Sequence, residues 1–212
     1  MISVDFHTHT NASKDSMTTP EEFISASRRK RLGRVVVTDH DTISGAQLPK
    51  NLAPDLIIVG EEIMTTRGEI LAAFVTEEVP GGLSPIETIQ RLKCQGAFIS
   101  VSHPFDAWRS GAWNLADLIE ILSLVDAIET FNSRCMFPGA NRKAMDFAKD
   151  HDIPGTAGSD SHAPFEIGAS AVILPEFGNG EELRKVIRLG KVSGHRSPIW
   201  VHFFSRYAHF RK

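Results

Sequence analysis

The stretch 2-ISVDFHTH-9 decides the fold, because an apolar strand pattern runs directly into two histidines. Residues two apart in a strand face the same side of a sheet, so the imidazoles of His7 and His9 can converge on one ion. A lone histidine is more often an ordinary core or surface residue. A His-x-His pair at a strand end, with acidic residues elsewhere in the chain, favours a metal site instead.

Short apolar runs of the same kind recur along the chain and predict eight strands. They cover residues 2–6, 34–38, 56–63, 70–75, 97–101, 127–131, 154–158 and 169–174. Helices are predicted between several of these runs. Thr19 and Ser84 each offer a capping hydroxyl, followed by a proline at the first helical position and a glutamate three residues after the cap. The alternation predicts a largely parallel sheet, either closed into a barrel or open.

Polar side chains at the ends of these runs decide between the two kinds of sheet. They are His7 and His9, Asp39 and His40, Glu61 and Glu62, His103, Glu129, and Asp160 with His162. The carboxyl ends of the strands surround one mouth in a closed barrel but spread along an edge in an open sheet. We therefore expect an α/β fold, a distorted TIM-like barrel with a metal site at the C-terminal ends of its strands.

The bulk properties of the chain suit one domain. Its 212 residues can bury a substantial core, and the formal net charge of -3 gives no reason to expect a general nucleic-acid binder. Met1 leads straight into the first apolar run, and no run approaches membrane-spanning length. We therefore expect a cytoplasmic protein that captures any anionic substrate locally and has no membrane partner.

Residues 198–212 form a tail of different character. Its aromatic residues Trp200, Phe203, Phe204 and Tyr207 fall at helical spacing, with basic residues beside them. This pattern favours a terminal helix docked on the barrel. A partner-binding or membrane-surface segment is the alternative.

Four residues near the strand ends have two interpretations each. Strand alternation sends Glu61 and Glu62 to opposite faces, so only one of them can point into the mouth. Asp39 follows a buried run and is either a ligand or the partner that orients a metal-bound imidazole; the second interpretation leaves His40 as the ligand. Arg134 could clamp an anion through its guanidinium fork or lie on the surface.

Taken together, these motifs resemble those of the polymerase and histidinol phosphatase (PHP) family. The matching segments are His7-Thr8-His9, Thr38-Asp39-His40-Asp41, Gly60-Glu61-Glu62-Ile63, Ser102-His103-Pro104 and Gly158-Ser159-Asp160-Ser161-His162. The resemblance implies a distorted barrel of about seven β/α units, (β/α)7, with a site for two or three metal ions in its mouth. The implied PHP-like domain covers residues 1–197.

The resemblance also implies a set of metal ligands. His7, His9, Glu62 and Asp160 would hold one ion, Asp15, His40 and His162 a second, and Glu62 and His103 a third. Many relatives place the acidic ligand one residue before Asp15, where this chain has Lys14. Glu69 stands where a third-site histidine is common. Either its carboxylate replaces that imidazole, or the third site is weak or absent.

Imidazole and carboxylate ligands suit divalent Mn, Zn or Fe. The expected function is hydrolysis of a phosphate ester by a metal-activated water, with Arg134 as a phosphate clamp and Asp39 as an orienting residue. The expected partner is a small phosphorylated substrate, a nucleotide or a nucleic-acid end. An amidohydrolase-like enzyme that cleaves a C–N or C–O bond and a non-catalytic metal-binding domain are the alternatives.

Overall fold

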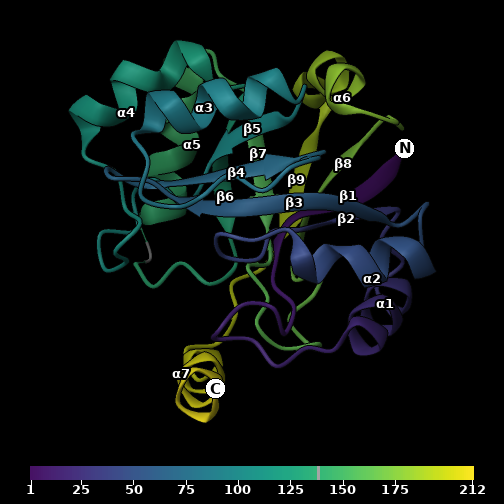
Figure 1. Cartoon of the computed structure of the whole chain (residues 1–212). Helices are drawn as coiled ribbons and strands as arrows, with labels where there is room; N and C mark the ends of the chain where they lie inside the picture. The colour runs from purple at the N-terminus through teal and green to yellow at the C-terminus, as the bar shows by residue number, and fades with distance from the viewer. Residues whose placement is uncertain (138) are drawn as a thin grey trace.

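The computed structural model describes residues 1–137 and 139–212, and their strands and helices alternate along most of the chain (Figure 1). The strands are β1 (Ile2–Thr8), β2 (Arg34–Val37), β3 (Ile57–Met64), β4 (Glu69–Ala73), β5 (Phe98–Val101), β6 (Ala127–Asn132), β7 (Gly155–Gly158), β8 (Ser170–Leu174) and β9 (Lys191–Gly194). The helices are α1 (Pro20–Arg29), α2 (Ser44–Leu52), α3 (Pro85–Cys94), α4 (Leu115–Ile121), α5 (Ala140–Asp150), α6 (Gly180–Val186) and α7 (Val201–Arg211), with short 3-10 turns η1 (Leu122–Leu124) and η2 (Ile187–Leu189).

Both helix starts that the sequence predicts are confirmed. The hydroxyl of Thr19 accepts a hydrogen bond from the backbone N–H of Glu22, whose side chain accepts one from the N–H of Thr19 in return. Ser84 caps α3 in the same way by accepting from the N–H of Glu87. These caps satisfy N–H groups that have no partner inside the helix, and so fix where α1 and α3 begin.

The sheet curls into a nearly closed barrel, as the polar strand ends predict. Its strand order is β7-β6-β5-β4-β3-β2-β1-β8-β9. The segment after β7 meets the end of β1, where the N–H of Asp160 donates to His7 O at 2.7 Å and the N–H of His9 donates to Ser161 O at 3.0 Å. The first and last strands of the barrel therefore touch at the mouth.

The sheet is less parallel than the sequence analysis expects. β4 runs antiparallel to both β3 and β5, and β8 runs antiparallel to β1. Residues 65–68 join β3 to β4, with the N–H of Thr65 donating to Gly68 O at 3.0 Å. So short a turn can return the chain only alongside the preceding strand, because a parallel strand needs a longer crossover. The α/β barrel is confirmed, whereas a count of seven β/α units is not.

Apolar side chains from β1 to β7 meet inside the barrel, and further clusters pack the helices on its outside. The interior cluster includes Val4, Phe6, Val36, Ile58, Phe98 and Ala157. Outside, α3, α4 and α5 lie on one side of the strands, and α1 and α2 lie on the other (Figure 1). This burial holds the strand ends in fixed positions, which a site built from several strands requires.

Two elements in the second half of the chain differ from the sequence-based expectation: β9 was not predicted, and the predicted helix of the tail turns its aromatic side chains outward. β9 has no expected counterpart, because all its residues are exposed and only Val192 is a strong strand former. Helix α7 forms within the tail, but its aromatic side chains point largely to solvent, and its buried residues are Val201 and Ala208. Among the described residues, no helix combines the length and apolar character needed to cross a membrane.

Candidate metal centre

Glu62, on β3, lies at the centre of the side-chain cluster in the barrel mouth. Its Oε2 atom lies 3.1 Å from His7 Nε2, 3.4 Å from His9 Nε2 and 3.2 Å from His40 Nδ1. Its Oε1 atom lies 3.4 Å from His103 Nε2. One buried carboxylate thus faces four imidazoles from three segments of the chain, an arrangement suited to bridging ions.

A second group of ligand atoms forms around Asp15, on the loop between β1 and α1. Its Oδ2 atom lies 2.9 Å from His162 Nε2 and 3.6 Å from His40 Nε2. The ring of His9 lies between the other two rings, 4.5 Å from that of His40 and 4.3 Å from that of His162 between centroids. Ligand atoms of the three histidines lie within 4.8 Å of one another.

Asp160 and Glu69 complete the cluster on opposite sides. Asp160 Oδ1 lies 3.7 Å from His7 Nε2 and 3.5 Å from His9 Nε2. Glu69 Oε2 lies 3.3 Å from His103 Nε2, and Glu69 groups with His40 and Glu62 within 4.8 Å. The fold therefore brings together all the residues that the sequence analysis names as ligands, Asp15 and Glu69 included.

The donor set and its unpaired atoms fit metal ions. Within the described residues, four buried side-chain atoms of the proposed ligands have no hydrogen-bond partner: His103 Nδ1, His103 Nε2, Asp15 Oδ1 and Asp160 Oδ1. An unsatisfied buried polar atom costs about 1–3 kcal/mol, which coordination to a cation would remove. The donors are imidazole nitrogens and carboxylate oxygens without a thiolate, a set that suits Mn, Zn or Fe.

The histidines differ in how readily they hold a proton. Burial alone would lower the pKa of His7 and of His40, but nearby carboxylates outweigh it and raise both pKa values, that of His40 to about 10. Burial lowers the pKa of His9 to about 4, with help from the neighbouring His162 and His40. An ion bound to His7 or His40 would therefore compete with a proton for the ring more strongly than an ion bound to His9.

Residues behind the cluster fix the orientation of the rings. Glu129, on β6, lies with Oε1 3.1 Å from His7 Nδ1, and its Oε2 accepts from the N–H of His103 at 2.9 Å. Asn132 Nδ2 donates to Glu129 and to Asp160, at 3.1 Å in each case. Such partners hold one tautomer and one ring orientation in metal sites.

Asp39 supports the cluster indirectly, through residues of the loop between β1 and α1. Its carboxylate accepts hydrogen bonds of 2.5–3.2 Å from the backbone and hydroxyl groups of Thr10 and Ser13. Ser13 Oγ in turn lies 3.2 Å from His9 Nδ1. Asp39 thus holds the loop that carries Asp15, and it reaches His9 through Ser13.

The approach of β7 to β1 under the site requires a glycine. A Cβ atom on Gly158 would overlap the Cβ of His7 and come within 2.8 Å of Glu129 Oε1. Just beyond, the carboxylate of Asp5 accepts from the N–H and hydroxyl of Ser159, and burial raises the pKa of Asp5 to about 6. The following residue, Asp160, has a φ of 53°, a strained value for a residue with a side chain. These contacts fix where its carboxylate enters the cluster.

Two guanidinium groups flank Asp160, of which the sequence analysis indicates only Arg134. This residue is 2% exposed; its Nη1 donates to Asp160 O at 3.5 Å and its Nη2 to Ser205 Oγ at 2.8 Å. Arg109, on the loop after β5, lies with Nη1 2.6 Å from Asp160 Oδ2. Its place after the Ser102-His103-Pro104 motif could have indicated it, because loops at this end of a barrel carry site residues.

Glu166 is a further buried residue that the motifs leave out. Its Oε2 accepts from the N–H of His162 at 3.2 Å, and its Oε1 lies 3.6 Å from Arg134 Nε. Burial raises the pKa of Glu166 to about 7. It lies in a segment without a periodic apolar pattern, so the sequence carries no signal for it.

The barrel and its side-chain cluster are typical of one class of proteins. Members of this class hold metal ions with histidines and carboxylates at the C-terminal ends of the barrel strands. A family model described as PHP-associated matches residues 138–192. The uncharacterized protein MJ0417 of Methanocaldococcus jannaschii is 33% identical over 179 residues, which cover 83% of this chain and 72% of that protein. The chain belongs to the PHP domain family.

Solved structures share the fold at lower sequence identity. A two-domain protein from Bacteroides vulgatus, described as containing a predicted PHP-like metal-dependent phosphoesterase, matches with a TM-score of 0.73 at 21% identity. The match covers 92% of this chain and 65% of that one. The lesion-specific endonuclease EndoQ from Pyrococcus furiosus matches with a TM-score of 0.64 at 18% identity, over 90% of this chain and 57% of that one.

Proposed function

We propose that this chain is a metal-dependent phosphoesterase, which hydrolyses a phosphate ester with a metal-activated water. The observation that carries the proposal is the convergence of imidazoles and carboxylates on Glu62, with Arg109 and Arg134 beside Asp160. Metal ligands next to two guanidinium groups suit a reacting group that is itself an anion. Membership of the PHP family supports the same function.

Two or three ions would lower the pKa of a water molecule and offset the charge that develops on the phosphoryl oxygens. The proposed ligands are His7, His9, Asp15, His40, Glu62, Glu69, His103, Asp160 and His162. Glu129 would keep His7 in one tautomer through its contact with Nδ1. Asp39 would act as a positioning residue, because it holds the loop that brings Asp15 to the cluster.

Arg109 and Arg134 are the proposed phosphate-binding residues. Arg109 pairs with Asp160 Oδ2, while Oδ1, which has no hydrogen-bond partner, faces His7 and His9 and would take the ion. A phosphate oxygen would share the guanidinium fork of Arg109 with Oδ2. Arg134 is held more loosely at Nη1, where its hydrogen bond to Asp160 O is 3.5 Å long. The two forks approach Asp160 from different loops, so a phosphate between them would be fixed in orientation as well as in position.

The proposed substrates are a small phosphomonoester, a nucleotide or a nucleic-acid end, and the proposed functional unit is residues 1–197 with the tail 198–212 docked on it. The test is a screen of phosphate esters with the full chain reconstituted with Mn, Zn or Fe, alongside amide and carboxylic ester substrates. Turnover of phosphate esters supports the proposal. Turnover confined to C–N or C–O bonds, or metal binding without turnover of either substrate class, contradicts it.

A further inference from the structure

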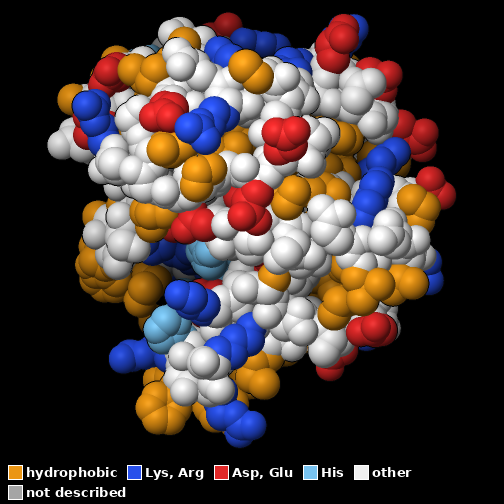
Figure 2. Space-filling model, in the orientation of Figure 1, with side chains coloured by type: hydrophobic (Ala, Val, Ile, Leu, Met, Phe, Trp, Pro, Cys, Tyr) orange, Lys and Arg blue, Asp and Glu red, His pale blue; other side chains and the backbone are white. Residues whose placement is uncertain are grey.

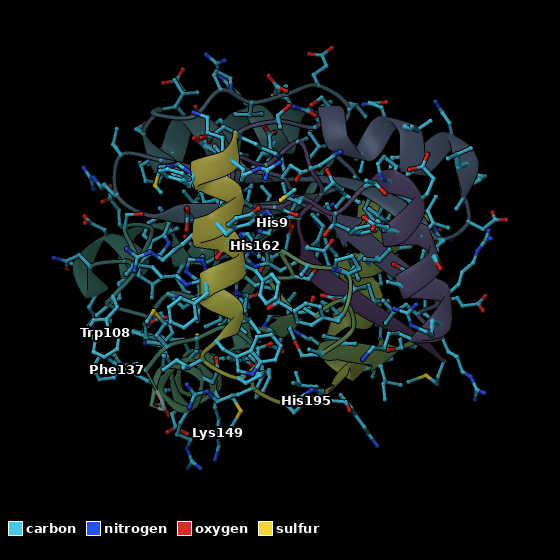
Figure 3. The ribbon with its side chains drawn as sticks, turned by 90° about the horizontal axis from the view of Figure 1, so that it is seen from below. His9, Trp108, Phe137, Lys149, His162 and His195 are labelled. Carbon is cyan, nitrogen blue, oxygen red and sulfur yellow. The ribbon has the colours of Figure 1, made fainter. Side chains whose placement is uncertain are left out.

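Helix α7 forms one wall of the metal centre. Figure 3 shows it running across the barrel mouth, with His9 and His162 labelled beside it. Ser205, on α7, accepts the 2.8 Å hydrogen bond from Arg134, so the helix directly contacts a residue beside Asp160. At the far end, Lys212 Nζ donates to the carbonyl groups of Asn11, Ser13 and Ser16 at 2.5–2.7 Å. The helix is thus tied to the loop that carries Asp15.

Polar contacts hold α7 in this place together with apolar packing, in which the ring of Phe204 lies 5.5 Å from that of Phe165 between centroids. Its buried apolar residues are Val201 and Ala208, while Phe203 is 68% and Phe210 90% exposed. A helix that served only to cover a core would turn its largest apolar side chains inward. The side chains that α7 turns toward the mouth therefore need a role other than covering a core.

A cavity of about 600 Å³ lies between α7 and the edge of the metal cluster, lined by Asp15, Ser205, Arg206, His209 and Phe210. Figure 2 shows the hollow above α7, with basic and histidine side chains at its rim. In the part of the chain that the structure describes, Arg206 and His209 make no ion pair. The Asp15 carboxylate faces His162 and His40 instead. The cavity therefore has Arg206 and His209 on the side of α7 and Asp15, a proposed metal ligand, on the other side.

We propose that this cavity is a second anion subsite, in which Arg206, with His209, binds a phosphate group of the substrate other than the one that is hydrolysed. The inference rests on the proposed phosphoesterase function and narrows its substrate class to esters that carry a second phosphate. Asp15 belongs both to the cavity and to the ligand cluster, so one molecule can reach both. A guanidinium group binds phosphate through two parallel hydrogen bonds, and the exposed ring of Phe210 can contact a sugar or base beside it.

Kinetics with two matched probes test the subsite. The full chain, reconstituted with the metal that gives activity, is assayed with a 5′-phosphorylated dinucleotide and with the corresponding nucleoside 5′-monophosphate. We expect Arg206→Ala to raise KM for the dinucleotide roughly tenfold more than KM for the mononucleotide, with the larger effect in KM than in kcat, because a distant phosphate contributes binding to ground state and transition state alike. Arg211→Ala is the control, since Arg211 lies on the same helix and pairs with Tyr207 at 3.1 Å.

Calorimetric binding of both probes to the metal-free protein gives a second readout. We expect the parent to bind the dinucleotide more tightly than the mononucleotide, and Arg206→Ala to remove that preference. Equal effects of Arg206→Ala on both probes, or an equal effect of Arg211→Ala, would overturn the subsite and leave the phosphoesterase function standing. A parent that hydrolyses no phosphate ester contradicts the function instead, and the binding preference then decides the subsite alone.

Discussion

Replacing Glu62 and Glu61 separately by glutamine tests the whole arrangement of the mouth. Glu62 faces His7, His9, His40 and His103 at 3.1–3.4 Å. Glu61 lies on the other face of β3, where it accepts from the N–H of Val79 at 3.1 Å, and burial raises the pKa of Glu61 to about 8. Glutamine keeps the size of both side chains. Only Glu62→Gln therefore removes a charge from the cluster.

The size of the effect follows from the role of Glu62 as a bridge. Loss of a residue that merely orients a ligand weakens metal binding about 10–100-fold, so loss of the central ligand should weaken it at least about 100-fold. At metal concentrations well above Kd, a 100-fold weaker affinity removes about 2.7 kcal/mol of metal-dependent stabilisation. For a chain of this length, that lowers the metal-dependent rise in Tm by roughly 5–11 °C.

The assay is thermal unfolding of parent, Glu62→Gln and Glu61→Gln with and without added Mn, Zn or Fe, together with phosphatase activity. We expect Glu62→Gln to lose most of the metal-dependent Tm rise and nearly all activity, and Glu61→Gln to keep both. An equal loss of the metal-dependent Tm rise in the two variants would refute the reasoning, because it would mean that Glu62 has no special position in the cluster.

Three further predictions follow from the same geometry. Elemental analysis of the metal-reconstituted protein should give more than one metal equivalent per chain; one equivalent or none under metal excess would contradict a multinuclear centre. Arg109→Ala should leave metal content unchanged and raise KM for a phosphate ester about tenfold or more, whereas unchanged kinetics would remove Arg109 from the phosphate site. Gly158→Ala should destabilise the fold by about 1–3 kcal/mol in chemical denaturation and reduce metal content, because the added methyl group meets His7; wild-type stability would show that β7 can shift away.

Much of the side-chain cluster in the barrel mouth could be predicted because its residues follow local rules. Strand alternation places His7 and His9 on one face and separates Glu62 from Glu61, and the structure has these side chains where the alternation predicts. Glu69 could not be found by the rule that site residues follow strands, because it begins β4. It reaches the mouth because β4 runs antiparallel, and only the family resemblance pointed to it.

Contacts between distant segments were beyond the sequence analysis. Arg109 meets Asp160 only through the closure of the barrel, and no local pattern encodes that pairing. The aromatic spacing of the tail correctly indicates a helix but not which side of it packs inward. That side is set by Arg134 and by the carbonyl groups that Lys212 contacts, which lie far away in the chain.

The meeting of β1 with the end of β7 also bears on how the chain folds. Glu62 and Glu69 lie on a hairpin and can come together early, because closing a short loop costs little chain entropy. His9 and Asp160 approach each other only when the two ends of the barrel meet. An ion bound by both residues would stabilise this late, long-range contact. Metal binding would then chiefly slow unfolding. An interaction that forms after the transition state stabilises the native barrel but not the transition state.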